Sequence, residues 1–395
     1  MSLHICFAVI SACIGIYYYY YHTLFWNAPY WDADRPLFPP GYNYCQAAYP
    51  SASIYNNVPP PWTLYQLHIL TRHGDRAPST HIPTEIWSTC PQPSENLTIP
   101  TTILPNARAV LWTLPSTRYW NGTCMTGQLT VRGIHQMHTL GKWFANVYGE
   151  WNVVARSTHV WRTIQGAQAF LTGLVPKGDA IPLHVYPKAV DTLSLSLVCP
   201  RVVEVYKAAR RTGEYKVYQE RAERVARGVS NAMGVEYRDL ERWFDIVQCR
   251  RCWGKEGLGD VEDEVVRLAY WWLRFEYNAT RMVELGLRVG PLLDELVQAM
   301  EGGKKELYYY SAHDTTISGV LGVLGVEPVV WPPYASHLVF EVWTRGEGEK
   351  GVRVLYNGQV LDLGCGEMGL CGWQAFVGLI EKFLVVDLKK ECRPV

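Results

Sequence analysis

The chain has 395 residues, of which 48% are hydrophobic and 19% are charged, a balance typical of a globular protein and not of a disordered one. Lysine plus arginine number 37, as do aspartate plus glutamate, so the formal net charge is zero. Without a basic surplus there is no field suited to nucleic acid, and we expect no nucleic-acid partner. An anionic ligand has to be held by a local cluster instead.

The first segment carries the strongest signal for the cellular compartment. Residues 3–26 contain no Asp, Glu, Lys or Arg and are long enough to span a bilayer. We predict an uncleaved membrane anchor at residues 1–26, because no basic residue precedes the apolar run and the small-residue site at 11–13 comes too early for a signal peptidase. Secretion after cleavage of a signal peptide is the alternative.

Sequons and cysteines agree with the secretory pathway. The triplets that begin at Asn96, Asn121 and Asn278 are glycosylation acceptors if the body of the chain is lumenal or extracellular. Nine of the eleven cysteines lie beyond the anchor, and in an oxidising compartment they predict disulfide bonds with at least one thiol left over. Cys249 and Cys252 have the spacing of a zinc or redox motif, but no second pair or histidine cluster lies at ligand spacing. We therefore expect no metal site.

Residues 27–61 are rich in Pro, Tyr, Asn and Ser and end in three consecutive prolines. Stacked prolines cannot join the interior of a helix or sheet, so this segment is predicted to be a stalk or an extended strap. Cys45 within it suggests that part of it is tied to the body of the protein.

The catalytic body is predicted to cover residues 62–395 and to open with an apolar strand that ends in a basic cluster. Arg72, His73, Gly74 and Arg76 follow this strand, and catalytic groups collect at strand ends in α/β sheets. His73 can act as an uncharged nucleophile, and the two arginines offer planar charged groups that suit a phosphate. Alone, such a pair is more often a solvated loop, but further segments accompany it.

The next segments alternate between helix and strand. Residues 129–148 have apolar side chains three or four apart, which predicts an amphipathic helix. Residues 151–155 predict a short strand that delivers Arg156, with Ser157 or Thr158 capping the helix that follows. An arginine at such a junction suits a phosphate, since the helix N-terminus adds its own positive potential. Arg162, six residues later, is expected to be structural.

The rest of the chain completes an α/β pattern. Residues 200–300 read mainly as helix and are predicted to form an inserted cap over the site. Strands are expected at 181–186 and 307–310, the second leading into His313 and Asp314. Alternating strands at 338–343 and 352–356 and a closing helix at 373–383 follow. We predict an α/β fold with a mostly parallel central sheet flanked by helices.

Four segments of the chain together resemble one family. Residues 72–78, Arg-His-Gly-Asp-Arg-Ala-Pro, resemble the signature of the histidine acid phosphatases, the larger branch of the histidine phosphatase superfamily. Residues 127–141 resemble the helix of that family that begins Gly-Gln-Leu-Thr, residues 155–158 its Arg-Ser-Thr segment, and residues 310–316 its distal His-Asp motif. The similarity covers roughly residues 62–385 and implies a core like that of phosphoglycerate mutase. The chain departs from the family at His159 and Trp161, where acidic residues are usual.

The resemblance implies an acid phosphatase that hydrolyses phosphate monoesters through a phosphohistidine intermediate, with neither metal nor cofactor. His73 is the implied nucleophile and Asp314 the implied general acid. The residues implied to hold the phosphate are Arg72, Arg76, Arg156 and His313.

The substrate within the family stays open at this point. A general acid phosphatase acting on small-molecule or glycan phosphomonoesters is the leading hypothesis. The anchor and the segment at 352–358 are similar to those of the membrane-anchored phosphoxylose phosphatases of the Golgi, so a sugar-phosphate enzyme is the alternative. A catalytically inactive protein that binds phosphorylated ligands or glycans is a third hypothesis, which the complete set of site residues disfavours.

Overall fold

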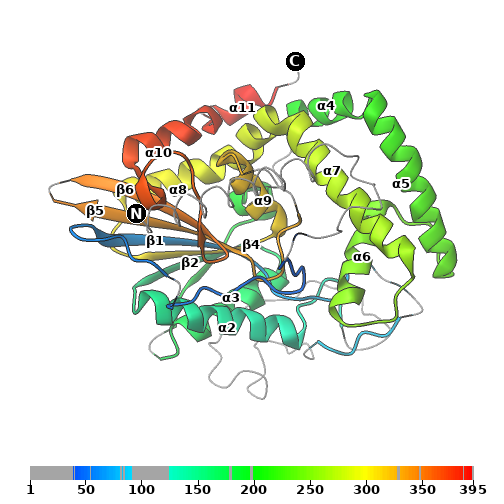
Figure 1. Ribbon diagram of the computed structural model, residues 1–395, viewed down its shortest axis with the longest axis horizontal. Coiled ribbons are helices and arrows are strands. Elements are labelled where there is room, and N and C mark those ends of the chain that lie inside the picture. The colour runs from blue at the N-terminus through cyan, green and yellow to red at the C-terminus, as the bar shows by residue number, and fades with distance from the viewer. Residues whose placement is uncertain are drawn as a thin grey trace, which may run out of the picture.

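An eight-stranded sheet runs through the molecule, with helices on both of its faces (Figure 1). This computed structural model describes residues 39–393 apart from residues 40, 54, 81, 83–84, 91–123, 178–179, 196–198, 327–329, 347 and 386. The predicted anchor at 1–26 and the sequons at Asn96 and Asn121 lie outside the described residues. The strand order is β3-β2-β4-β1-β5-β6-β7, and β8 pairs with β6.

Four strands form a parallel half of the sheet. They are β3 (Leu183–Val185), β2 (Val153–Ser157), β4 (Leu307–Ala312) and β1 (Thr63–Arg72). Arg72 is in register with Ala312 and Ser157 with Ser311, so the carboxyl ends of β1, β4 and β2 lie at one edge. The residues that follow these strands therefore meet at that edge, which is where α/β sheets bind ligands.

The other half of the sheet is antiparallel. It contains β5 (His337–Arg345), β6 (Glu349–Tyr356), β7 (Gln359–Val360) and β8 (Leu370–Gly372), with β5 pairing antiparallel to β1. The two alternating strands expected near the end of the body thus extend the parallel core. The α/β fold class is confirmed, and the sheet is mixed because β5 pairs antiparallel with β1 and the later strands pair antiparallel in turn.

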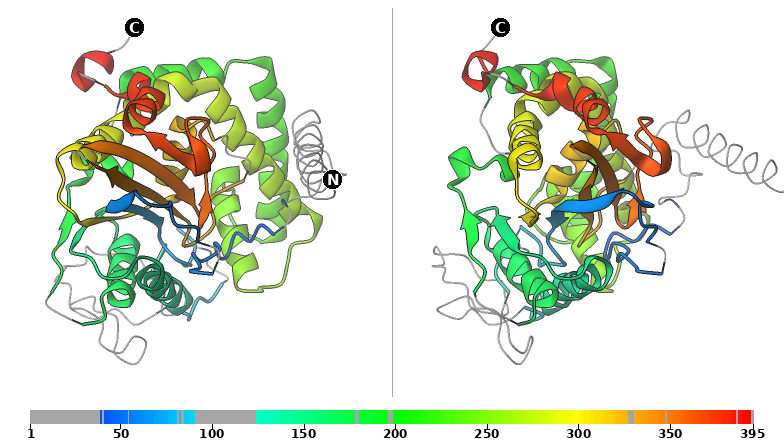
Figure 2. Two further views of the ribbon diagram at one scale, coloured as in Figure 1. Left: turned by 60° about the vertical axis from the view of Figure 1, so that its left-hand side comes forward. Right: turned by 90° about the vertical axis from the view of Figure 1, so that its left-hand side faces the viewer.

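Neighbouring side chains of each strand point into different cores. Ile69 packs with α2 (Val131–Tyr148) and α3 (Trp161–Leu174), whereas Leu70 packs with α8 (Gly290–Gly302), α9 (Asp314–Val323) and α10 (Trp373–Ile380). The two helical layers lie on opposite faces of the sheet (Figure 2). The helices predicted at 129–148 and 373–383 are the ones that appear as α2 and α10.

The helical region predicted at 200–300 stands beside the sheet. It contains α4 (Pro200–Ala209), α5 (Gly213–Ala232), α6 (Leu240–Cys252) and α7 (Asp260–Glu284), and a π-helical segment (Leu285–Val289) leads from α7 into α8. These helices bury a core of their own around residues such as Trp243 and Val266. In Figure 1 they lie next to the end of the sheet where β4 leads into α9. Asn278, the third sequon, is exposed on α7.

Four disulfide bonds confirm the prediction from cysteine usage, with one described cysteine, Cys249, left free and buried. The pairs are Cys45–Cys252, Cys90–Cys124, Cys199–Cys392 and Cys365–Cys371. The first pair ties the N-terminal strap to α6, and the neighbouring Tyr44 is 6% exposed. Part of the segment predicted as a stalk is therefore packed into the folded body. No helix among the described residues has the length and apolar character needed to cross a membrane.

Candidate active site

His73 lies directly after β1 and is buried. Its Nδ1 atom is 2.8 Å from the carbonyl oxygen of Gly74, and Nε of Arg162 donates a hydrogen bond to its Nε2 atom over 3.0 Å. A carbonyl oxygen can only accept and a guanidinium can only donate, so the ring proton sits on Nδ1 and Nε2 keeps its lone pair. Burial, followed by the charges of Arg162, Arg72 and Arg76, lowers the pKa of His73 well below its usual value. The imidazole is therefore neutral, and Nε2 is its nucleophilic atom.

Arg72 connects β1 to the acidic group of the site. Its Nη2 atom lies 2.9 Å from Oδ2 of Asp314, the first residue of α9, and also donates to the hydroxyl of Tyr44 at 2.9 Å. Asp314 Oδ2 accepts a second hydrogen bond from the indole of Trp331 at 2.7 Å. Desolvation alone would raise the pKa of Asp314, but Arg72 and the Trp331 indole hold it at about 2. Without a ligand, Asp314 is an anion paired with Arg72.

Arg76 is held by a residue of α6, in the helical region α4–α7 that we call the cap. Its Nη2 atom lies 2.6 Å from Oδ1 of Asp245 on α6, and the other carboxylate oxygen of Asp245 accepts from the backbone amide of Ser79 at 2.7 Å. The cap thus orients one arginine of the cluster. No recognisable sequence motif surrounds Asp245, Tyr44 or Trp331. The sequence analysis therefore did not identify these three residues as part of the site.

His313 faces His73 across the site. The ring centroids are 5.8 Å apart, and Nε2 of His313 lies 3.0 Å from the hydroxyl of Thr158. Desolvation and the charge of Arg162 lower the pKa of His313 to about 3, so this ring is also neutral. The structure brings His313 and Asp314 together with Arg72, His73 and Arg76, as the distal motif had suggested.

The structure of the Arg-Ser-Thr segment at residues 155–158 differs from the prediction. β2 runs on to Ser157 and α3 begins only at Trp161, with Val160 at its N-cap, so the prediction of a helix cap at Ser157 or Thr158 is wrong. As a result, the arginine in the first turn of α3 is Arg162, whose Nε contacts His73. The sequence analysis expected Arg162 to be structural, whereas in the structure its side chain is in direct contact with His73.

Arg156 has a different set of partners. Its Nη2 atom lies 2.9 Å from Oδ1 of the fully buried Asp191, its Nη1 atom contacts Glu295 of α8, and its guanidinium covers the ring of Tyr186. Two carboxylates therefore already engage the arginine that the sequence assigned to the phosphate. Arg162 is the arginine of this segment that donates a hydrogen bond to His73.

The two cysteines of the Cys-x-x-Cys segment are not a pair. Cys252 is bound to Cys45, whereas Sγ of Cys249 lies 3.4 Å from the hydroxyl of Tyr334, and burial raises the pKa of this thiol. Within the described part of the chain, no group of three or more His, Cys, Asp and Glu side chains is placed to hold a metal ion.

Comparison with known proteins identifies the family of the chain. The model of the histidine phosphatase superfamily (branch 2) matches residues 63–357, well over half of the chain, and the chain belongs to this family. It is 27% identical over 393 residues to counting factor 60 of Dictyostelium discoideum, covering 88% of this chain and 92% of that protein. It is 28% identical over 308 residues to human lysosomal acid phosphatase, covering 68% of this chain and 72% of that protein.

Two further comparisons bear on substrate and fold. Human 2-phosphoxylose phosphatase 1 is 26% identical over 357 residues, which cover 78% of this chain and 73% of that protein. The apo phytase of Hafnia alvei superposes with a TM-score of 0.57 at 15% identity, over 86% of this chain and all of that one. At this identity the second likeness shows the fold alone.

Proposed function

We propose that the protein is an acid phosphatase that hydrolyses phosphate monoesters through a phosphohistidine formed on His73. The observation that carries the proposal is the contact between Arg162 and Nε2 of His73, because it defines a neutral imidazole whose lone pair faces a cationic group. A phosphoryl group placed between them meets a nucleophile and its counter-charges together.

The first chemical step joins Nε2 of His73 to phosphorus and breaks the bond from phosphorus to the ester oxygen. Arg72, Arg76 and Arg162 hold the non-bridging oxygens, where negative charge must be matched in the transition state. The departing oxygen takes a proton from Asp314. Water then attacks the phosphohistidine, Asp314 takes up the proton of that water, and phosphate leaves with His73 restored.

The resting state of Asp314 bears on the source of the proton. Asp314 is ionised without a ligand, since its pKa is about 2 beside Arg72. A phosphate monoanion brings one proton with it, and its charge offsets that of the arginines that keep Asp314 ionised. We infer that the substrate delivers this proton to Asp314 as it binds.

A sugar-phosphate phosphatase is the second candidate. It is supported by the similarity to 2-phosphoxylose phosphatase 1 across most of the chain. We also propose a lumenal or extracellular location in the secretory pathway, which the four disulfides and the similarity to a lysosomal acid phosphatase support. The anchor at 1–26 and glycosylation at Asn96, Asn121 and Asn278 are part of this proposal.

The experiment that tests the function is capture of the intermediate. Protein mixed with ³²P-labelled 4-nitrophenyl phosphate and quenched in alkali should carry a label that acid removes, as a phosphoramidate requires. His73→Ala should lose both the label and nearly all hydrolysis. A protein that binds the ester without turnover or label would be the inactive binding protein of the third hypothesis, and a label retained in His73→Ala would refute the assignment of the nucleophile.

A further inference from the structure

Three hollows adjoin one another beside the catalytic cluster. The innermost is lined by Arg76, Asp245 and Asp314, and it shares Glu241 and Trp331 with both of the others. The two outer hollows measure about 360 and 320 Å³, sizes that small-molecule sites commonly have. We call the space formed by the two outer hollows the cap groove. Its defining residues are Tyr215, Tyr237, Glu241, Trp272 and Trp331.

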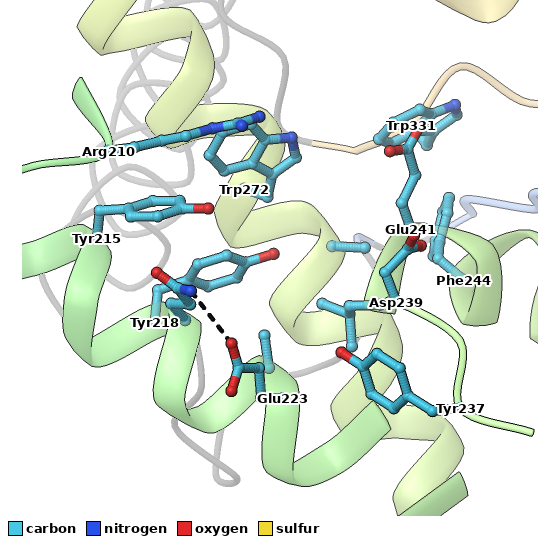
Figure 3. Close-up of a pocket in the computed structure, with 14 residues that line it drawn as sticks. Arg210, Tyr215, Tyr218, Glu223, Tyr237, Asp239, Glu241, Phe244, Trp272 and Trp331 are labelled. Carbon is cyan, nitrogen blue, oxygen red and sulfur yellow. Dashed lines mark hydrogen bonds between the residues drawn. The ribbon is translucent and has the colours of Figure 1, made fainter. Parts of the chain in front are cut away.

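Aromatic rings face the cap groove from opposite sides. Figure 3 shows Tyr215 and Trp272 on one side and Trp331 on the other, with Tyr237 at a third position. Tyr215 comes from α5 and Trp272 from α7, and their ring centroids are 5.6 Å apart. Such rings offer flat apolar faces with polar tips, and the phenol groups add hydrogen-bonding sites at their edges.

The charges of the groove do not suit a polyanion. Among the described residues that line the three hollows, carboxylates outnumber guanidinium groups by six to four, and none is a lysine or a histidine. Two of the guanidinium groups, Arg76 and Arg242, are paired with Asp245 and Asp239. Desolvation, followed by the charges of Asp239 and Asp245, raises the pKa of Glu241, so these neighbouring carboxylates add negative charge around it. A second phosphate at this position would be repelled.

Trp331 links the groove to the chemistry. Its indole donates to Oδ2 of Asp314, the carboxyl that serves the leaving oxygen, while its ring lines the groove. A leaving group that receives its proton from Asp314 is therefore beside the wall of the cap groove. The remainder of a large substrate has this space to occupy.

We propose that the cap groove is a saccharide-binding subsite, which takes the uncharged sugar rings of a phosphorylated saccharide whose phosphate lies at His73. Sugar rings have apolar C–H faces that can lie on Trp331 and against the edge of Trp272, whose ring is covered by the guanidinium of Arg210. Their hydroxyls can donate to Glu241 and accept from Arg210 or the phenols. This inference rests on the proposed phosphatase function. It narrows the class of preferred substrates to phosphorylated saccharides and excludes inositol polyphosphates from that class.

The test compares three esters. Trehalose 6-phosphate can reach the groove with a sugar ring, glycerol 3-phosphate is a polyol too short to fill it, and inositol hexakisphosphate places further anions in it. We expect kcat/KM for trehalose 6-phosphate to exceed the value for glycerol 3-phosphate by about tenfold or more, as one aromatic contact allows. Equal values for these two esters, or a preference for inositol hexakisphosphate, would overturn the proposal.

Single-residue variants test whether the preference for trehalose 6-phosphate arises in the cap groove. Trp272→Ala should reduce the ratio of the first two kcat/KM values by about tenfold. Tyr237→Ala should also reduce this ratio. The side chain of Tyr237 is 43% exposed, so its removal should not impair folding. Trp62→Ala, at the opposite end of β1 beneath Arg345, is the matched control and should leave the ratio as it is. A ratio that does not respond to either groove variant would also overturn the proposal.

A binding measurement separates the two proposals. Unphosphorylated trehalose should quench tryptophan fluorescence of the wild-type protein and should do so less in Trp272→Ala. If no ester is hydrolysed but the quenching is seen, the phosphatase function fails and the saccharide subsite stands. If esters are hydrolysed without preference and no quenching occurs, the subsite fails and the phosphatase function stands.

Discussion

Arg162 donates a hydrogen bond from Nε to Nε2 of His73 over 3.0 Å. The same contact that identifies the lone pair of His73 also occupies it while the site is empty. An incoming phosphoryl group carries oxygens that accept more strongly than an imidazole, so it can draw the guanidinium away and free the nucleophile. In the proposed mechanism, Arg162 thus protects His73 at rest and binds the phosphate during the reaction.

The first prediction separates Arg162 from Arg156. Arg162→Ala should lower kcat for 4-nitrophenyl phosphate by roughly 10²–10³-fold, the loss typical for one donor to a developing anion. It should also weaken inhibition by free phosphate. Arg156→Ala should act on stability, because it leaves the buried Asp191 without its charged partner, which costs about 3–5 kcal/mol of unfolding free energy.

Kinetics and thermal unfolding of the two variants check this prediction. Loss of phosphate inhibition in Arg156→Ala, with inhibition kept in Arg162→Ala, would instead support the sequence-based assignment of Arg156 to the phosphate. Arg156→Lys, which keeps a charge beside Asp191 and Glu295, is a control that should recover part of the stability.

The second prediction concerns pH. The pKa of His73 is lowered well below its usual value by burial and by Arg162, so the nucleophile stays neutral through mildly acid pH and activity should persist there. Asp314, whose pKa is held at about 2 by Arg72 against desolvation, holds no proton of its own above that pH. As pH rises through the second pKa of the substrate, about 6 for a phosphate monoester, the monoanion that brings the proton disappears. We therefore expect kcat/KM to fall tenfold per pH unit above this value.

The measurement is the alkaline limb of kcat/KM for two esters whose second pKa values differ. If the proton arrives with the substrate, the pH at which kcat/KM begins to fall should shift with the second pKa of the ester. A limb at the same pH for both esters would assign the proton to a group of the protein.

Local patterns were enough to predict most of the fold and part of the site. The cluster at Arg72, His73 and Arg76 comes at the end of β1, whose apolar sequence clearly predicts a strand. His313 and Asp314 follow β4, which was predicted in the same way. Arg156 and Arg162 could not be told apart, because the choice depends on where α3 begins and Val160 carries no capping side chain. Sequence patterns do not predict which residues a disulfide bond or a cap helix places in the active site. Tyr44 and Asp245 reach the site by those routes, one next to Cys45 and one on α6.

The third prediction concerns the tie between strap and cap. Replacing Cys45 and Cys252 by serine should lower the free energy of unfolding by about 2–5 kcal/mol, since this bond closes a long loop. It should also reduce activity, because Tyr44 next to it accepts a hydrogen bond from Arg72. Urea unfolding and kcat/KM measure both effects. Replacing Cys365 and Cys371, only six residues apart, is the control and should cost less stability and little activity.

The last prediction isolates the role of Asp314. An alkyl phosphate has a basic leaving oxygen that needs a proton, whereas 4-nitrophenolate is stable and barely needs one. Asp314→Asn should therefore cut kcat/KM for an alkyl ester by roughly 10²–10⁴-fold, the size of general acid catalysis, and harm the nitrophenyl ester much less. The variant also removes the carboxylate from Arg72, so a control is needed for the lost ion pair. Asp245→Asn removes the equivalent carboxylate from Arg76 and should slow both esters by similar factors. Equal losses for both esters in Asp314→Asn would show that Asp314 only orients Arg72, and that the leaving oxygen takes its proton elsewhere.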